Sequence, residues 1–410
     1  MTTGDTPPLP AAVAGGPLAG IVVIDMATMM AGPHTAMMMA DFGATVIKVE
    51  APGGDPSRHS PNRVNGTSVY WRLLGRNKYA VTINLKHPEG RALMLKLVER
   101  ADVLVENMRP GKLEALDLAP ETLHAVNAGL VILRITGWGQ TGPYADRATF
   151  GTQAEAMSGF AYANGHPDGP PTLPPQTIAD GSAGYLGAFS TMAALWRRAQ
   201  DPERRGQVID LSLFESLFCM FGPSISAYDK LGVVPQRRGS RAAVAAPRNI
   251  YRCRDDRWVA ISCAAEQIAK RLFDIIGRPE LYADGPFGTV EGRAANVDEL
   301  DAVIQHWMLQ HDADDAIAAL TAGGATASPI YSIPEIMADP QFTSRGLVAD
   351  APADDIGSIK MQNVFPKMSE TPGHIAWSGR ALGADNHLWF ADHLGLDEAE
   401  IARLRSVGAI

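Results

Sequence analysis

Residues 21–49 read IVVIDMATMMAGPHTAMMMADFGATVIKV, and this stretch decides the fold. The apolar run at residues 21–24 predicts a short buried strand, and the apolar segment at residues 36–42 predicts a helix that ends before Gly43. Residues 45–49 predict a second strand. Two strands joined by a helix form a βαβ unit, so the sequence predicts parallel strands at this point.

The alternation of strands and helices continues to residue 135. Pro88 opens a predicted helix in which Leu93 and Leu97 recur at helical spacing. A further helix is expected at residues 120–126. Additional buried strands are predicted at residues 80–84, 103–105 and 130–135. This part of the chain is therefore expected to be α/β with a largely parallel sheet.

The character of the chain changes in its second half. Two long helical segments, residues 182–198 and 211–231, are separated by a predicted strand at residues 207–210. After a basic, turn-rich connection, short strands and helices predict a smaller α+β domain. Its expected elements are strands at residues 249–252 and 258–262 and helices at residues 267–276, 297–310 and 314–322. A final amphipathic helix is expected at residues 397–404.

Length and composition set the class of protein. The 410 residues suggest two domains, and 46% hydrophobic with 20% charged residues is typical of a globular protein. The net charge of −9 argues against a nucleic-acid partner, and Asp25 interrupts the best apolar run, so no membrane span is expected. Three cysteines without CxxC spacing indicate reduced thiols and a cytoplasmic location. Residues 1–17 are expected to be a disordered tail.

Several common catalytic and binding motifs are absent or misplaced. The run Gly137-Trp-Gly-Gln-Thr-Gly142 matches G-x-G-x-x-G, but Pro143 follows where a helix should open, so we interpret the run as a structural turn. The sequence lacks the P-loop pattern and the Gly-x-Ser-x-Gly pattern of hydrolases. His306 and His311 are five residues apart, which does not suit two zinc ligands on one helix face. No metal site is predicted.

Asp180 is the most informative candidate residue. It is a lone carboxylate placed where an apolar, glycine-containing helix is expected to begin. Free backbone N–H groups at a helix start can hold such a carboxylate and can stabilise charge that develops on a substrate beside it. Taken alone, a structural cap is the more common role of an Asp at this position. Lys86, Arg109 and Lys112 follow predicted strands and suit either an anion-binding rim or a solvated surface.

Taken together, the motifs of this chain resemble those of the family III CoA-transferases. The similarity runs from Leu18 to Ile410. The matching segments are Ala31-Gly-Pro33, Gly43-Ala-Thr-Val-Ile-Lys-Val-Glu50, Gly53-Gly-Asp55, Asn77-Lys78, Pro88-Glu-Gly90, Val105-Glu-Asn107, Arg109-Pro-Gly111, Gly137-Trp-Gly-Gln-Thr-Gly-Pro143, Ile178-Ala-Asp180 and Leu394-Gly-Leu396. No single segment is specific, and their joint order carries the resemblance.

The resemblance implies a Rossmann-like large domain, a smaller domain and an interlocked homodimer. On this plan residues 18–222 form the first part of the large domain, and residues 223–248 are a linker. Residues 249–332 form the small domain. Residues 333–410 are a linker that returns to the large domain.

The resemblance also implies a role for Asp180. In the family, the corresponding aspartate attacks an acyl-CoA thioester to give a mixed anhydride, and CoA then forms an aspartyl-CoA thioester that an incoming carboxylate resolves. A carboxylate needs no general base and a thiolate leaves readily, so neither a metal nor a histidine is required. Coenzyme A enters as a substrate, carried by the acyl-CoA. The implied CoA contacts are Leu85, Lys86, Asn107, Met108 and Arg109.

The chain departs from the family pattern at several positions. Two arginines that contact CoA in formyl-CoA transferase correspond to Ala51 and Ala115, so Arg58 or Lys112 would have to supply the positive charge. The active-site glutamine of that enzyme corresponds to Met30, and its second carboxylate corresponds to Gly151. Its tetraglycine loop corresponds to residues 241–246. Formyl and oxalyl groups are therefore poor candidates for the acyl group.

The sequence favours a CoA-transferase that moves CoA from an acyl-CoA to a free carboxylic acid. In the racemase branch a His-Asp pair moves an α-proton, whereas Phe150 and Gly151 occupy that stretch here. Met30, Phe150 and the methionines at residues 37–39 suggest an apolar acyl pocket, although such methionines are often core residues. The alternatives are an acyl-CoA racemase or isomerase and a catalytically silent CoA-binding protein.

Overall fold

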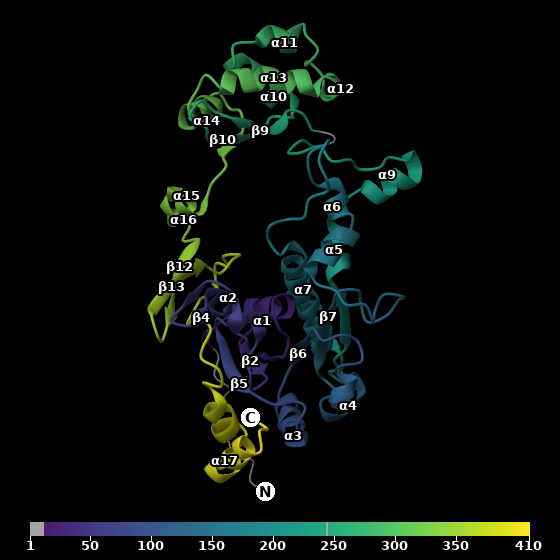
Figure 1. The fold of residues 1–410 in the computed structure, drawn as a ribbon, viewed down its shortest axis with the longest axis vertical. Helices are drawn as coiled ribbons and strands as arrows, with labels where there is room; N and C mark the ends of the chain where they lie inside the picture. Colours follow the sequence, from purple (N-terminus) through teal and green to yellow (C-terminus); the bar gives the residue numbers. More distant parts are fainter. Residues whose placement is uncertain (1–11, 243–244) are drawn as a thin grey trace. The chain divides into compact units, whose positions relative to one another are not determined.

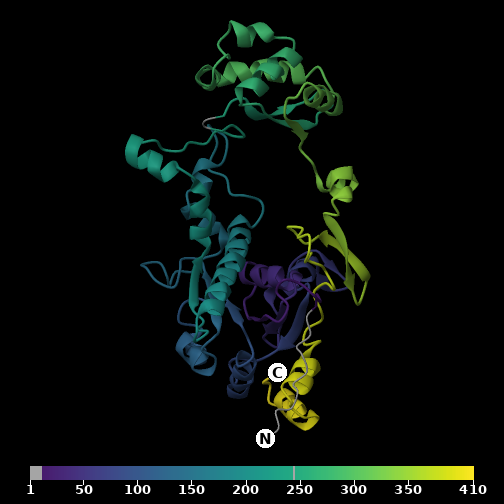
Figure 2. The same cartoon turned by 180° about the vertical axis from the view of Figure 1, so that it is seen from behind.

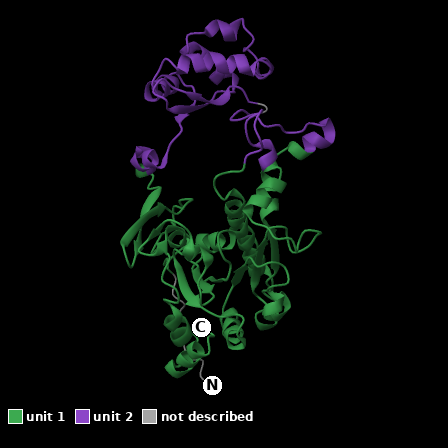
Figure 3. Cartoon of the chain, in the orientation of Figure 1, with its two compact units in different colours: residues 1–160, 173–225, 343–410 green, residues 161–172, 226–342 purple. Residues whose placement is uncertain are grey.

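The computed structural model describes residues 12–242 and 245–410. The chain divides into two compact units, each with its own hydrophobic core. Unit 1 consists of residues 1–160, 173–225 and 343–410, and unit 2 consists of residues 161–172 and 226–342 (Figure 3).

Residues 12–17, which were expected to belong to the disordered tail, pack against unit 1. The Val13 side chain is buried. A Cβ added at Gly16 would lie 2.3 Å from the carbonyl oxygen of Phe42, so a glycine is needed for this close backbone approach. The rest of the expected tail, residues 1–11, lies outside the described residues.

Unit 1 is built on a six-stranded parallel sheet (Figure 1). The strands, in the spatial order β5-β2-β1-β6-β7-β8, are β5 Lys78–Thr82, β2 Thr45–Glu50, β1 Val22–Asp25, β6 Val103–Glu106, β7 Val131–Thr136 and β8 Val208–Ser212. The chain first adds strands on one side of β1 and then on the other. A topological switch point therefore lies between β1 and β6, and open α/β sheets bind ligands outside the strand carboxyl ends at such points. The predicted α/β fold with a parallel sheet is confirmed.

Helices cover both faces of this sheet, as a parallel sheet requires. The helices of unit 1 are α1 Ala31–Asp41, α2 Val69–Leu74, α3 Pro88–Val98, α4 Pro120–Val126, α5 Gly151–Met157, α7 Ile178–Gln200, α8 Leu213–Phe218 and α17 Glu398–Ser406. Short helical turns are η1 Pro56–His59, η2 Glu114–Leu116, η3 Cys219–Phe221 and the π-helical η4 Leu388–His393. Seen from behind, α7 runs beside α1 (Figure 2).

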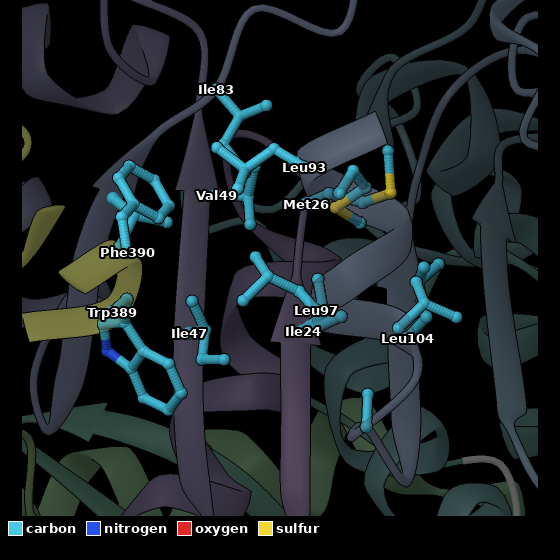
Figure 4. Packing of buried hydrophobic residues seen from close by; sticks show 14 of the residues in the cluster. Ile24, Met26, Ile47, Val49, Ile83, Leu93, Leu97, Leu104, Trp389 and Phe390 are labelled. Atoms are coloured by element: carbon cyan, nitrogen blue, oxygen red, sulfur yellow. The ribbon is translucent and has the colours of Figure 1, made fainter. Parts of the chain in front are cut away.

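Successive residues of a strand point to opposite faces and enter different cores. Ile24 and Ile47 pack with α3 on one face, where Leu104 joins them (Figure 4). Val23 and Val46 enter the other core, which contains residues of α1 and α7. The central strands are buried along their whole lengths, which explains why they read as continuous apolar runs in the sequence.

The C-terminal segment belongs to unit 1. Trp389 and Phe390 are buried in the same core as Ile47 (Figure 4). Arg403 of α17 forms an ion pair with Glu89 of α3, and the two helices lie together at one end of the unit (Figure 1). Two small antiparallel pairs complete unit 1, namely β3 Arg63–Val64 with β4 Thr67–Ser68 and β12 Val348–Ala353 with β13 Gly357–Gln362.

The predicted long helix at residues 211–231 is wrong. Strand β8 extends to Ser212, and the helical stretch that follows is interrupted at Gly222, which adopts φ 58° and precedes a proline. A left-handed glycine followed by proline ends a helix, because proline restricts the residue before it. Helix α9, Ser224–Leu231, is a separate element.

Unit 2 is a smaller α+β unit, as expected. Its antiparallel sheet has the order β11-β10-β9, with β9 Arg248–Arg252, β10 Trp258–Ser262 and β11 Ala327–Pro329. Its other helices are α6 Phe160–Ala163, which begins at the unit boundary, α10 Glu266–Ile275, α11 Pro279–Ala283, α12 Val290–Ala295, α13 Val297–Met308, α14 Ala313–Ala322, α15 Ile333–Ala338 and α16 Pro340–Ser344, which crosses into unit 1.

Unit 2 also includes residues 161–172, which the sequence placed in the large domain. The backbone N–H of Gly239 donates to the carbonyl of Gly165 at 2.8 Å, and this contact ties the segment to unit 2.

None of the helices in the described parts of the chain is long and apolar enough to cross a membrane.

Candidate active site

Asp180 lies in the first turn of α7, which begins at Ile178. The helix therefore starts four residues earlier than the sequence predicted, and the carboxylate belongs to the helix instead of preceding it. Thr177 occupies the N-cap position, but its side chain makes no capping hydrogen bond. The first N–H groups of the helix have other acceptors: the Ile178 N–H donates to the carbonyl of Gln176 at 2.9 Å, and the Ala179 N–H donates to Glu155 Oε1 at 3.4 Å.

The glycines of α7 allow α1 to approach it closely. A Cβ added at Gly184 would lie 2.7 Å from His34 Nδ1, and one at Gly187 would lie 2.5 Å from Thr35 Oγ1. The Thr35 hydroxyl donates to the carbonyl of Gly184 at 3.0 Å. The glycines therefore serve helix packing, and they fix the position of the helix that carries Asp180.

The Asp180 carboxylate is desolvated and has no ion-pair partner among the described residues. Its Oδ2 atom points at Gly151, the first residue of α5, where an added Cβ would lie only 2.4 Å away. Burial, and then the negative charge of Glu155, raise the pKa of Asp180 to about 6. A carboxylate of higher pKa that lacks a cation is more basic than a salt-bridged one.

A cavity of about 570 Å³ opens next to the start of α7. Thr177 and Tyr70 line it, and burial followed by the charge of Asp180 raises the pKa of Tyr70 to about 12. Its lining includes the apolar side chains of Met29, Val69, Leu73 and Met361 and the polar side chains of Ser60, Asn62 and Gln362. The cavity therefore suits a ligand that combines an apolar chain with polar ends.

None of the residues expected to form the apolar pocket lines this cavity, and the methionine of the same loop that does line it, Met29, was not predicted. Met29 lines the cavity in a left-handed conformation with φ 67°, which is rare for a residue other than glycine. Met37 and Met39 are instead buried in the protein interior, and 74% of Phe150 is exposed. The side chains of α1 were assigned to the pocket because the sequence does not show which helix face points inward.

A second cavity, of about 530 Å³, lies at the carboxyl ends of β1, β2, β5 and β6. Among the predicted CoA contacts, Leu85, Lys86 and Met108 line this cavity. The Asn107 side chain holds Thr28 through two backbone hydrogen bonds of 2.8 and 2.7 Å, so it supports the wall. Arg109 is exposed and is not among the residues that line this cavity.

The proposed replacement cations differ in their availability. Arg58 is committed to Glu50 through two hydrogen bonds of 2.6 Å and lies over the Trp71 ring at 3.6 Å. It is therefore a structural residue. Lys112 is exposed, and Lys86 is the one cation among the described residues that line the second cavity.

The loop between β1 and α1 contributes to both cavities, because Met29 lines the first and Thr28 lines the second. A fully buried ion cluster holds this loop. Lys48 Nζ lies 3.6 Å from Asp25 Oδ1 and donates to the carbonyl of Ala27, and Lys78 Nζ donates to Asp25 Oδ2 at 2.8 Å.

Sequence reasoning missed Tyr70, Glu155 and the cavity residues of β13. Tyr70 follows a loop rich in proline and glycine, and the six-residue α2 is too short to give a helical period. The turn at residues 137–142 has the structural role predicted for it, since the Gln140 N–H donates to Asp210 of β8 at 3.0 Å. Within residues 12–242 and 245–410 no group of three His, Cys, Asp or Glu side chains could hold a metal ion.

Comparisons with known proteins agree on one family. Residues 18–386 match the family described as CoA-transferase family III. Succinyl-CoA–D-citramalate CoA-transferase of Chloroflexus aurantiacus is 40% identical over 392 residues, which are 95% of this chain and 97% of that protein. Succinate–glutarate CoA-transferase of Agrobacterium fabrum is 34% identical over 364 residues, 87% of this chain and 90% of that protein. A CAIB/BAIF family protein from Brucella suis has a similar structure, with a TM-score of 0.83 at 31% identity, covering 92% of this chain and 99% of that chain.

Proposed function

Because this chain belongs to CoA-transferase family III and is a CoA-transferase, we propose that Asp180 is its nucleophile. One observation carries the proposal: a desolvated carboxylate without a cation lies in the first turn of α7, beside a cavity. A salt-bridged carboxylate would be a poor nucleophile, because the cation stabilises its charge. Asp180 is free of that restraint within the described residues.

The chemistry follows from the carboxylate. An Asp180 oxygen attacks the thioester carbonyl carbon, and CoA leaves as a thiolate to give a mixed anhydride. The thiolate then attacks the aspartyl carbonyl, which releases the first acid and leaves an aspartyl-CoA thioester. The acceptor carboxylate attacks the aspartyl carbonyl of this thioester and expels the CoA thiolate, which gives a second mixed anhydride. The thiolate then attacks the acceptor's acyl carbon, which forms the new acyl-CoA and releases the Asp180 carboxylate. The partial positive charge at the start of α7 is suited to stabilise the oxyanions.

We place the nucleotide end of CoA in the second cavity. It lies at the carboxyl ends of the strands next to the switch point, where α/β sheets bind such ligands. Lys86 is exposed there, and its ammonium group forms no ion pair with any of the described residues. A phosphate group would supply that partner.

We propose a short dicarboxylic acid as the acceptor. The relatives named above are described as acting on succinyl-CoA with citramalate and on succinate with glutarate. The cavity beside Asp180 has the mixed lining that a short chain between two carboxylates requires. Lys360, the cation in its described lining, is already paired with Asp350, so neutral donors such as Asn62 and Gln362 would hold the distal carboxylate.

We further propose that the protein is a homodimer. One face of α7 packs on α1, whereas three large apolar side chains at helical spacing, Phe189, Met192 and Trp196, are exposed. Phe189 and Trp196 are 72% and 71% exposed, and a contiguous apolar stripe of this kind marks an interface. Sedimentation of the purified chain at twice its mass would support the proposal. The unpaired cysteines suit a reducing, cytoplasmic location.

Covalent trapping tests the role of Asp180. The chain is incubated with succinyl-CoA, quenched with hydroxylamine and analysed by intact mass and peptide mapping. We expect a modified Asp180 in the wild type, CoA exchange when glutarate or citramalate is added, and neither in Asp180→Asn, because the amide is not a nucleophile. Full turnover by Asp180→Asn would refute the proposal. Deuterium uptake at the α-carbon without any acceptor would instead show a racemase.

A further inference from the structure

Glu155 is a buried carboxylate next to the proposed nucleophile. It lies one helical turn beyond Gly151 on α5, and 4% of it is exposed. Helix α5 packs against α7 and α8. Among the described residues no lysine, arginine or histidine forms an ion pair with Glu155. A buried carboxylate without a cation is costly, so its presence needs an explanation.

The Glu155 carboxylate holds the beginning of α7. The backbone N–H of Ala179 donates to Glu155 Oε1 at 3.4 Å, and the N–H of Ile178 also interacts with this carboxylate. Because the Thr177 side chain makes no cap, Glu155 caps the helix from a neighbouring element. The residue next to these two N–H groups in the chain is Asp180.

Glu155 is also the charged group that acts most on Asp180. Of the causes that raise the pKa of Asp180, burial comes first and the charge of Glu155 second. Burial likewise raises the pKa of Glu155, against the effect of the two backbone N–H groups. Two carboxylates in one desolvated place disfavour each other's charge.

The other ionisable groups around α7 in the described parts of the chain form no ion pair with Glu155 or Asp180. On α1, His34 lies against Gly184 and has its pKa lowered to about 4 by burial and then by Lys78 and Arg76. On α2, Tyr70 is neutral at physiological pH because its pKa is raised to about 12.

The remaining elements that pack against α7 are α8, β7 and β8. On α8, Glu215 accepts from Ser212. Arg134 of β7 binds Glu106, and Asp210 of β8 accepts from the Gln140 N–H.

We propose that Glu155 is a positioning residue of the transfer reaction. It fixes the first turn of α7 and places a second negative charge beside Asp180, so that the resting carboxylate is less stable relative to its uncharged acylated forms. This inference rests on the proposed role of Asp180 as nucleophile.

The effect follows from where the charge goes during the reaction. Asp180 is negative in the free enzyme but neutral as the mixed anhydride and as the aspartyl-CoA thioester, since its charge leaves with the thiolate or the released carboxylate. A fixed negative neighbour therefore disfavours the starting state more than either covalent intermediate. Glu155 itself gains and loses no bond.

Two variants separate the charge of Glu155 from its capping bond. Glu155→Gln keeps an oxygen that can accept from Ala179 but removes the charge, whereas Glu155→Asp keeps the charge and shortens the reach. The readouts are the pH profile of the acylation step with succinyl-CoA and the fraction of Asp180 trapped by hydroxylamine. The melting temperature of each variant is measured in parallel.

For Glu155→Gln we expect the acid limb of the profile to move down by about one pH unit, because one like charge is removed. The trapped fraction should fall, and the KM for succinyl-CoA should stay unchanged. For Glu155→Asp we expect a wild-type acid limb even if the melting temperature falls.

The inference would be overturned if Glu155→Gln had its acid limb at the same pH as the wild type and the same trapped fraction of Asp180. If that variant does not fold, a limb shifted to lower pH in Glu155→Asp would overturn it instead, since the charge is retained there. The wild type separates the two hypotheses: with no trapped Asp180 in the wild type the proposed function fails, whereas a trapped wild type with an unaltered Glu155→Gln profile refutes only the role of Glu155.

Discussion

Asp25 and Asp180 are carboxylates of the same unit, the first buried and the second partly buried, and the charges next to them have opposite signs. Asp25 is fully buried at the end of β1 and is bound by Lys48 and Lys78. Asp180 forms no ion pair within residues 12–242 and 245–410, and its charged neighbour there is another carboxylate, Glu155. Cations around the first carboxylate stabilise the fold, whereas their absence around the second leaves an oxygen able to react. The contrast shows that burial alone does not identify a catalytic acid, and that the sign of the neighbouring charge does.

Removing a cation from Asp25 should have the largest effect. In Lys48→Met the Asp25 and Asp55 carboxylates lose a partner in the interior, so we expect the free energy of unfolding to fall by about 3–5 kcal/mol. Urea denaturation measures it. The matched control is Lys360→Met, which breaks the exposed pair with Asp350 and should cost less than about 1 kcal/mol. Equal losses in the two variants would contradict the structural role assigned to the Asp25 cluster.

Asp180→Asn should change the free energy of unfolding in the opposite direction and raise it. The folded chain raises the pKa of Asp180 from 3.8 to about 6, so the folded state binds a proton more readily than the unfolded state between these values. The stability linked to this proton is present below pH 4 and is lost as the pH rises through about 6. At pH 8 we therefore expect Asp180→Asn to be more stable than the wild type by about 1–2 kcal/mol, after allowance for partial solvent screening.

Urea denaturation at pH 8 and near pH 4 tests this sign. The gain should be largely lost near pH 4, where Asp180 is protonated in the folded state and begins to be protonated in the unfolded state, whose pKa is 3.8. A variant less stable than the wild type at pH 8 would show that Asp180 is held by contacts like those of Asp25, and the comparison between the two carboxylates would fail.

Gly151→Ala should have the smallest effect on stability but should impair the reaction. The new Cβ would lie 2.4 Å from Asp180 Oδ2, so the carboxylate or α5 must shift. A displacement of this size lowers the rate by about 10–10²-fold, while stability should change by less than about 1 kcal/mol. Steady-state transfer assays measure it, with the neighbouring exposed Thr152→Ala as the control. An unaltered rate would mean that Oδ2 is not the reacting oxygen.

The sequence predicted the features that local patterns encode. The apolar runs at residues 21–24 and 45–49 located two central strands of the sheet, and the resemblance directed attention to Asp180. Leu85, Lys86 and Met108 were correctly expected at strand ends, where the second cavity lies.

The sequence could not predict contacts made across long separations. Glu155 and Asp180 meet through the packing of α5 on α7, and no periodic pattern records this contact. Arg58 was considered as a free cation because only the structure shows that Glu50 and Trp71 hold it. Tyr70 escaped notice for a different reason, since α2 is too short to be recognised from its sequence.

The left-handed residue Met29 has a consequence for substrate length. Thr28 lines one cavity and the next residue, Met29, lines the other, so both cavities meet the same loop. If the nucleotide of CoA lies in one cavity and the thioester in the other, the pantetheine arm must pass over this loop. The length of the arm then determines where the thioester carbonyl lies. Truncated thioesters such as succinyl-N-acetylcysteamine would then reach the nucleophile without the nucleotide contacts. We expect them to have a lower kcat as well as a higher KM.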